Sequence, residues 1–122
     1  MKIAFAVLGY SLHFLRVRPF PKAYFVRHPS CMSIQYLVAD HFGIDPREMS
    51  SSRRLRAAAR ARQVAMYLIR RHTGASLPDI GRRMGGRDHT TVMHGIRRVE
   101  ELIASDPAFA SAVAECEARI AA

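Results

Sequence analysis

An acid, an imidazole and two hydroxyls stand side by side in the stretch GGRDHTTVMHGIRRVE, at Asp88, His89, Thr90 and Thr91. Side chains of these types hydrolyse bonds, hold metal ions or form hydrogen bonds with nucleic-acid bases. Which of these applies depends on the element that presents them. The apolar residues that follow are spaced 4, 3 and 4 apart, as on the buried face of a helix: Val92, Ile96, Val99 and Ile103.

A helix with this buried face would expose a strongly polar one. Its first positions are Asp88, a residue type that caps helices, and His89. The opposite face carries Thr90, Thr91, His94, Arg97 and Arg98. Carboxylates, hydroxyls and imidazoles contact base edges in the major groove, and helix N-terminal amides suit phosphates. The pattern predicts a recognition helix that enters a major groove with its N-terminus first.

Catalysis and metal binding fit these residues less well. A hydrolytic site needs a nucleophile, a base and an orienting group in one cleft, and we expect Asp88 and His89 to diverge, with Asp88 used as a cap. His89 and His94 are five residues apart, whereas ligands on one helix face lie three or four apart. No GxxxxGK[ST] loop is present. We therefore predict no enzyme activity, no metal, no cofactor and no nucleotide binding.

The elements that position this helix are also helical. After residue 30 no segment alternates like a strand, and we predict helices at about 33–42, 60–72, 76–84, 88–104 and 107–120, with a turn or short helix at 45–49. Ser76 and Asp79 form a predicted capping box at the start of the third helix. The Gly85-Gly86 turn between the third and fourth predicts a helix-turn-helix. The expected fold class is all-α, a small helical bundle containing a helix-turn-helix preceded by a basic loop.

The charge of the chain is concentrated. The net charge is +9, and residues 47–98 hold thirteen Arg against three acids, whereas residues 99–122 hold one Arg against five acids. The densest stretch, RRLRAAARAR, carries five Arg in ten residues. No acid between Glu48 and Asp79 is available to pair with them along a helix. This distribution predicts a polyanionic partner.

Residues 1–30 differ from the rest in composition. They hold five cations, no acid and three prolines, without a sustained helical period. We expect an N-terminal extension that is a disordered arm, a short strand-like appendage or sequence upstream of the true start, and a domain over residues 31–122. No apolar run reaches the ~18 residues of a membrane span, and Cys31 and Cys116 are too far apart in sequence for a CxxC motif. We predict a cytoplasmic, nucleoid-associated protein with no membrane partner.

The sequence GGRDHTTVMHGIRRVEEL resembles the signature of the C-terminal DNA-binding domain of the DnaA family of bacterial replication initiators. Three further stretches resemble the preceding elements of that domain in order: IQYLVADHFGI, SSRRLRAAARARQVAMYLIRR and SLPDIGRRMGGRDHTTV. The resemblance covers about residues 32–120. It implies binding of double-stranded DNA at DnaA-box-like sites, which are similar to TTATCCACA.

The resemblance also assigns roles to individual residues. Arg54, in the basic loop, would enter the minor groove, where A·T-rich geometry attracts a guanidinium. Asp88, His89 and Thr90 would read bases from the major groove. Phosphate contacts, or residues that fix the pose, would be Arg62, Gln63, Arg70, Arg87 and Thr91.

Some features depart from the family. Its members carry an ATPase module before this domain, which 122 residues are too few to contain. We therefore expect passive occupancy of sites by a regulator of initiation or transcription. Ala61 stands where the family commonly has Pro, so the basic loop should join the second helix more continuously. Two alternatives remain: an adaptor that binds protein through the acidic last helix, and a nonspecific basic DNA-binding protein. The oligomeric state is open.

Overall fold

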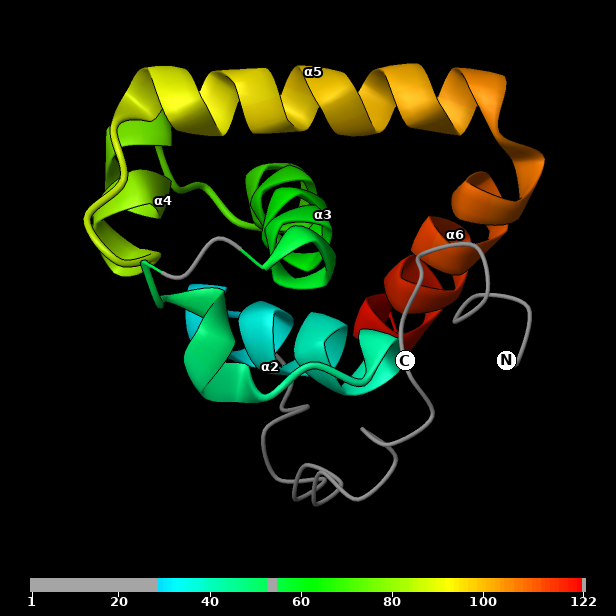
Figure 1. Cartoon of the computed structure of the whole chain (residues 1–122), viewed down its shortest axis with the longest axis horizontal. Coiled ribbons are helices and arrows are strands. Elements are labelled where there is room, and N and C mark those ends of the chain that lie inside the picture. Colours follow the sequence, from blue (N-terminus) through cyan, green and yellow to red (C-terminus); the bar gives the residue numbers. More distant parts are fainter. Residues whose placement is uncertain (1–28, 53–54, 122) are drawn as a thin grey trace.

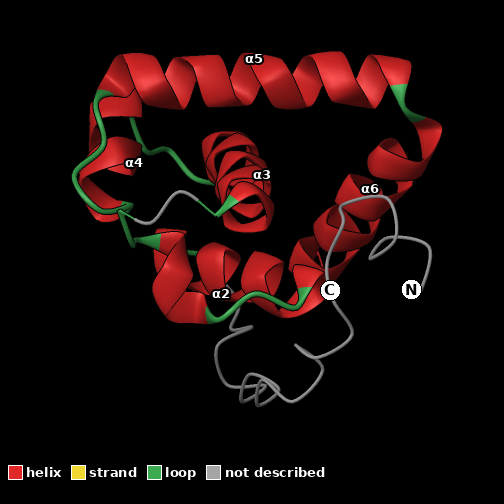
Figure 2. Cartoon of the chain, in the orientation of Figure 1, coloured by secondary structure: helices red, strands yellow, loops and turns green. Residues whose placement is uncertain are grey.

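The computed structural model describes residues 29–52 and 55–121, and within these ranges the regular elements are all helices (Figure 2). The elements are α2 (Cys31–Phe42), the 3-10 helix η3 (Pro46–Met49), α3 (Arg56–His72), α4 (Leu77–Arg83), α5 (His89–Ser105) and α6 (Pro107–Ala121). The predicted all-α class is confirmed. The predicted extension up to residue 28, and Arg54 of the basic loop, lie outside the described residues.

Helix α3 occupies the centre of the bundle (Figure 1). It packs against α5 on one side and α2 on the other, α4 contacts the first part of α5, and α6 returns from the end of α5 to α2. Its central place follows from its sequence, because apolar side chains cover more than one face: Ala58, Ala61, Val64, Ala65, Leu68 and Ile69 are all fully buried.

Helix α2 has strong signals at both ends. The hydroxyl of Ser30 accepts the backbone N–H of Ser33 at 3.1 Å, and the Ser33 hydroxyl accepts that of Ser30 at 2.8 Å. This reciprocal cap starts the helix at Cys31, two residues before the predicted start. Gly43 ends it as predicted, with φ of 68° and its N–H directed to the carbonyls of Ala39 and Asp40.

Helix α3 begins at Arg56, four residues before the predicted start. Its N-cap, Leu55, forms no side-chain capping bond, so the strong helix propensity of the Arg and Ala residues that follow sets the start. The helix runs without a break through Ala61, which confirms the expected continuous join. From Arg56 onward the basic stretch is therefore helix.

The helix-turn-helix is built on close backbone contacts. Ser76 caps α4 by accepting the N–H of Asp79 at 3.3 Å, whereas the Asp79 side chain binds Arg82 and Arg83 instead of completing the capping box. Gly81 is buried, and a Cβ on it would lie 2.0 Å from the carbonyl oxygen of Arg87. The two helices of the motif therefore approach as closely as they do because residue 81 is glycine.

Helix α5 lies on α3 at a second glycine. A Cβ on Gly95 would lie 3.0 Å from the sulfur of Met66 and 3.3 Å from Cγ of Gln63. Val92 and Val99, one turn to either side, are fully buried. Ile96 and Ile103 are only partly buried and pack against the edge of the core. The predicted inward face is thus correct, but its centre runs through Gly95.

Candidate nucleic-acid interface

Asp88, His89 and Thr90 form one connected group at the start of α5. Asp88 is the N-cap residue, as predicted, but its side chain makes no capping bond. Its Oδ2 instead accepts the Thr90 hydroxyl, and its Oδ1 lies 3.2 Å from Nδ1 of His89. The expected divergence of Asp88 and His89 is wrong, because the Asp88 carboxylate contacts both His89 and Thr90.

The connections within this group do not match a hydrolytic triad. The hydroxyl of Thr90 donates to the carboxylate of Asp88 and not to the imidazole of His89, so the nucleophile–imidazole–carboxylate order of a triad is absent from this group. The side chains of His89 and Asp88 are 55% and 64% exposed, which places them on an open surface. The Thr90 hydroxyl bond lowers the pKa of Asp88, so its carboxylate is an ionised hydrogen-bond acceptor at neutral pH.

The rest of the outward face of α5 is exposed, as the periodicity predicted. Its members are Thr91, His94, Arg97 and Arg98. Arg98 pairs with Glu101 at 3.2 Å, one turn along the helix. Arg97 is not paired with any carboxylate of the described residues. Its charge is therefore available to an external anion.

Gln63 and Arg70 bring α3 into the same surface. Gln63 lies beneath Gly95 of α5 and accepts a hydrogen bond of 2.7 Å from Arg60. Arg70 donates to the carbonyl of Ala75 at 2.9 Å, and it lines one groove together with Arg97. Gln63 and Arg70, two of the three predicted contacts on α3, thus lie beside α5.

Two α3 residues were not singled out from the sequence. Arg56 is exposed and has no carboxylate partner among the described residues, and Arg60 is half-buried and binds Gln63. With Gln63 they are spaced four and three apart, which is the spacing of one helix face. That spacing was the signal that could have identified them.

Arg62 and Arg87 lie in different surroundings from the other predicted contacts. Arg62 is 5% exposed, and its Nε and Nη2 donate to the carbonyl oxygen of Glu48 at 2.8 and 2.5 Å. Arg87 is half-buried and donates to the carbonyls of Met84 and Ser51. Burial lowers the pKa of both, although a guanidinium in a protein stays charged. A direct phosphate contact by Arg62 does not agree with this burial.

Two arginines form ion pairs with acidic residues that are distant in sequence but close in the fold. Arg71 of α3 binds Glu117 of α6 at 2.9 Å, and Arg119 of α6 binds Asp40 of α2 at 2.9 Å. The expected lack of i, i+4 acidic partners concerns the basic stretch, Arg53 to Arg62, and both of these pairs lie outside it. Excess positive charge remains on the outward side of α3 and α5.

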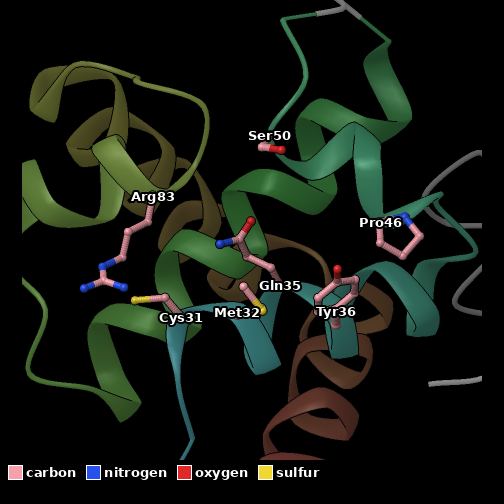
Figure 3. Close-up of a pocket in the computed structure, with 7 residues that line it drawn as sticks. All are labelled: Cys31, Met32, Gln35, Tyr36, Pro46, Ser50 and Arg83. Carbon is pink, nitrogen blue, oxygen red and sulfur yellow. The ribbon is translucent and has the colours of Figure 1, made fainter. Parts of the chain in front are cut away.

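A shallow pocket of about 260 Å³ lies apart from this surface, between the start of α2, η3 and the end of α4 (Figure 3). It is smaller than most ligand sites. Burial raises the pKa of the Cys31 thiol, so it is a poor nucleophile at neutral pH. The Nε of Arg83 lies 3.3 Å from Oδ2 of Asp79 and forms an ion pair with it. The residues that line it are Cys31, Met32, Gln35, Tyr36, Pro46, Ser50 and Arg83.

Residues 29–52 and 55–121 bring no three His, Cys, Asp or Glu side chains together into a group that could hold a metal ion. None of their helices has the length and apolar character required to cross a bilayer. Both cysteines in this part of the chain are buried as free thiols, and burial raises the pKa of Cys116 to about 12.

The sequence matches the family model described as the bacterial DnaA protein helix-turn-helix over residues 31–99, more than half of the chain. This segment runs from the start of α2 to Val99 of α5. It contains all the residues described above as candidate contacts to nucleic acid. The chain belongs to the DnaA helix-turn-helix family. Its helix-turn-helix is therefore α4 and α5, with α5 as the second, recognition helix.

Curated relatives agree with this membership. The chain is 59% identical over 73 residues to the chromosomal replication initiator protein DnaA of Cereibacter sphaeroides, 53% over 87 residues to that of Gluconobacter oxydans, and 56% over 75 residues to that of Caulobacter vibrioides. These segments are 60%, 71% and 62% of this chain, but only 16%, 18% and 15% of the relatives. What the chain shares with them is the DNA-binding DnaA helix-turn-helix domain.

Proposed function

We propose that residues 31–122 bind double-stranded DNA with a preference for DnaA-box-like sites, with the start of α5 in the major groove. The observation that carries this proposal is the connected group of Asp88, His89 and Thr90. Its side chains are exposed at a helix N-terminus and not used to cap it. An ionised carboxylate accepts hydrogen bonds from cytosine amino groups, and a Thr methyl contacts the methyl group of thymine.

The surrounding residues supply the backbone contacts in this proposal. Arg97 and Arg56, which have no carboxylate partner among the described residues, would neutralise phosphates on either side of the groove. The remaining contacts to phosphates or groove walls are Gln63, Arg70, Thr91 and His94. Arg54 would enter the minor groove, an assignment that rests on the family resemblance.

Fluorescence anisotropy tests the proposal directly. The full chain is titrated into a labelled duplex that carries TTATCCACA and into a scrambled duplex of the same composition, at two salt concentrations. We expect a preference for the box that persists near physiological salt, because base contacts, unlike phosphate contacts, do not depend on counterion release. Equal and steeply salt-dependent binding to both duplexes would leave only a nonspecific basic domain.

We further propose that these 122 residues occupy their sites without hydrolysing a nucleotide and act by competing at them. The support is that the printed sequence holds no GxxxxGK[ST] loop, while its relatives are named chromosomal replication initiators. Overproduction in a host whose origin carries DnaA boxes should delay initiation or change transcription beside the boxes. Unchanged timing and transcription, with the protein bound to the boxes, would exclude this regulatory role.

A further inference from the structure

Two guanidiniums hold the segment that leads into the basic loop. Arg62, from α3, donates twice to the carbonyl of Glu48, and Arg87, from the turn before α5, donates to the carbonyl of Ser51 at 2.6 Å. Residues 48–51 are thus fixed at both ends by arginines from two different helical units. The chain reaches Arg53 and Arg54 only two and three residues after Ser51.

The turn of the helix-turn-helix touches the same segment through its backbone. A Cβ on Gly85 would lie 2.3 Å from the carbonyl oxygen of Ser50, and Gly85 has φ of +81°. Arg87 also donates to the carbonyl of Met84, the C-cap residue of the first helix of the motif. One side chain therefore joins the end of α4, the start of α5 and the base of the basic loop.

We propose that Arg62 and Arg87 are positioning residues that hold residues 48–51, which lead into the basic loop, at a set distance from the recognition helix, and that neither binds a phosphate directly. This inference rests on the proposed function, in which the loop and the helix enter different grooves. Two elements that read neighbouring grooves must have a fixed separation, or the binding of one does not assist the binding of the other. Fixing them before DNA arrives reduces the ordering cost of binding.

Arginine suits this role better than lysine. Its planar guanidinium offers donors in several directions, so Arg87 reaches two carbonyls at once and Arg62 donates two N–H groups to one. Lysine has a single nitrogen on a flexible stem. A buried ammonium would also lose more hydration than a guanidinium.

The first test compares Arg87→Met with Arg97→Met, a matched loss of one cation at an exposed position. For each variant, affinity for the box and the scrambled duplex is measured over a series of salt concentrations. For Arg97→Met we expect a salt slope shallower by about one unit and an unchanged ratio of the two affinities. For Arg87→Met we expect the wild-type slope and a ratio reduced about tenfold or more.

A second variant keeps the inference testable if Arg87→Met does not fold. A single glycine inserted after Ser52 leaves both arginines and their carbonyl partners in place but separates the loop from them. Circular dichroism should show the wild-type helix content, with the box preference reduced as in Arg87→Met. An insertion variant with full box preference would overturn the inference, and so would a shallower salt slope with an unchanged ratio in Arg87→Met. Absence of preference in the wild type would instead refute the proposed function.

Discussion

Gly81 and Arg87 are in direct backbone contact across the turn of the helix-turn-helix. The N–H of Arg87 donates to the carbonyl of Gly81 at 2.8 Å, and the carbonyl of Arg87 lies where a side chain on residue 81 would begin. The contact sets where the chain re-enters a helix, and so where Asp88 and the residues after it are placed.

Gly81→Ala should therefore destabilise the domain. The added methyl group meets a backbone atom and not a movable side chain, so the loss should lie at the upper end of the ~1–3 kcal/mol typical of overpacking. Urea unfolding followed by circular dichroism measures it. Gly74→Ala is the matched control, since a Cβ there has no neighbour within 4 Å. Equal stability of the two variants would contradict the close contact.

Arg62→Met should change stability and leave the salt slope as in the wild type. Removing the guanidinium takes two hydrogen bonds of a charged donor from the Glu48 carbonyl, a loss of ~1.5–3 kcal/mol. Urea unfolding and salt-dependent anisotropy are measured on the same sample. Arg56→Met, at an exposed position, should show the reverse pattern. A shallower slope with unchanged stability would make Arg62 a phosphate contact after all.

Thr90→Val should reduce sequence preference without reducing electrostatic binding. Valine keeps the shape of threonine but cannot donate to Asp88, so the carboxylate loses the partner that orients it. The ratio of box to scrambled affinity should fall by an amount corresponding to ~1–3 kcal/mol, with an unchanged salt slope. Thr90→Ser, which keeps the hydroxyl, should retain most of the preference. If both variants retain the full ratio, Thr90 does not take part in base reading.

His41 should make the domain sensitive to mild acid. Burial lowers its pKa, and Glu115, with its Oε2 3.3 Å from Nε2 but not aligned as a hydrogen bond, offsets this only in part. Arg119 lowers the pKa further, while Asp40 raises it. The unfolded chain therefore takes up a proton at higher pH than the folded one. Stability should fall as pH decreases through about 6.5, the ordinary value for His.

The measurement is the free energy of unfolding between pH 8 and 5, with a slope of at most ~1.4 kcal/mol per pH unit for one proton. His41→Gln should flatten the curve in this range, and Glu115→Gln should steepen it, because the offsetting charge is lost. An identical curve for the wild type and His41→Gln would assign the acid sensitivity to another group.

The sequence predicted the helices and the outward face of α5, because Gly43, Ser76 and Pro107 mark ends and the apolar spacing marks faces. It placed the start of α3 too late, because no residue type marks that start and Leu55 forms no cap. Helix propensity over Arg56 to Ala59 was the available signal.

The buried arginines were harder to predict. Arg62 sits among alanines that form the buried stripe of α3, namely Ala58, Ala61 and Ala65, at spacings of three and four. The spacing of these alanines would have placed Arg62 on the buried face of α3. A helix rich in alanine and arginine is, however, usually interpreted as solvent-exposed. Arg87 donates to a backbone carbonyl 36 residues away in sequence. Every residue has a backbone carbonyl, so the residue types do not indicate this partner. Such contacts depend on the fold as a whole.

The charges separate along the length of the molecule as well as along its sequence. Helix α4 and the reading end of α5 lie at one end of the long axis in Figure 1, and the end of α5 and α6, which carry five acids against one arginine after residue 98, lie at the other. The domain is therefore an electric dipole. In the proposed mode of DNA binding, the field of a duplex would rotate the domain so that α4 and the start of α5 approach first, and fewer encounters would be lost to wrong orientations.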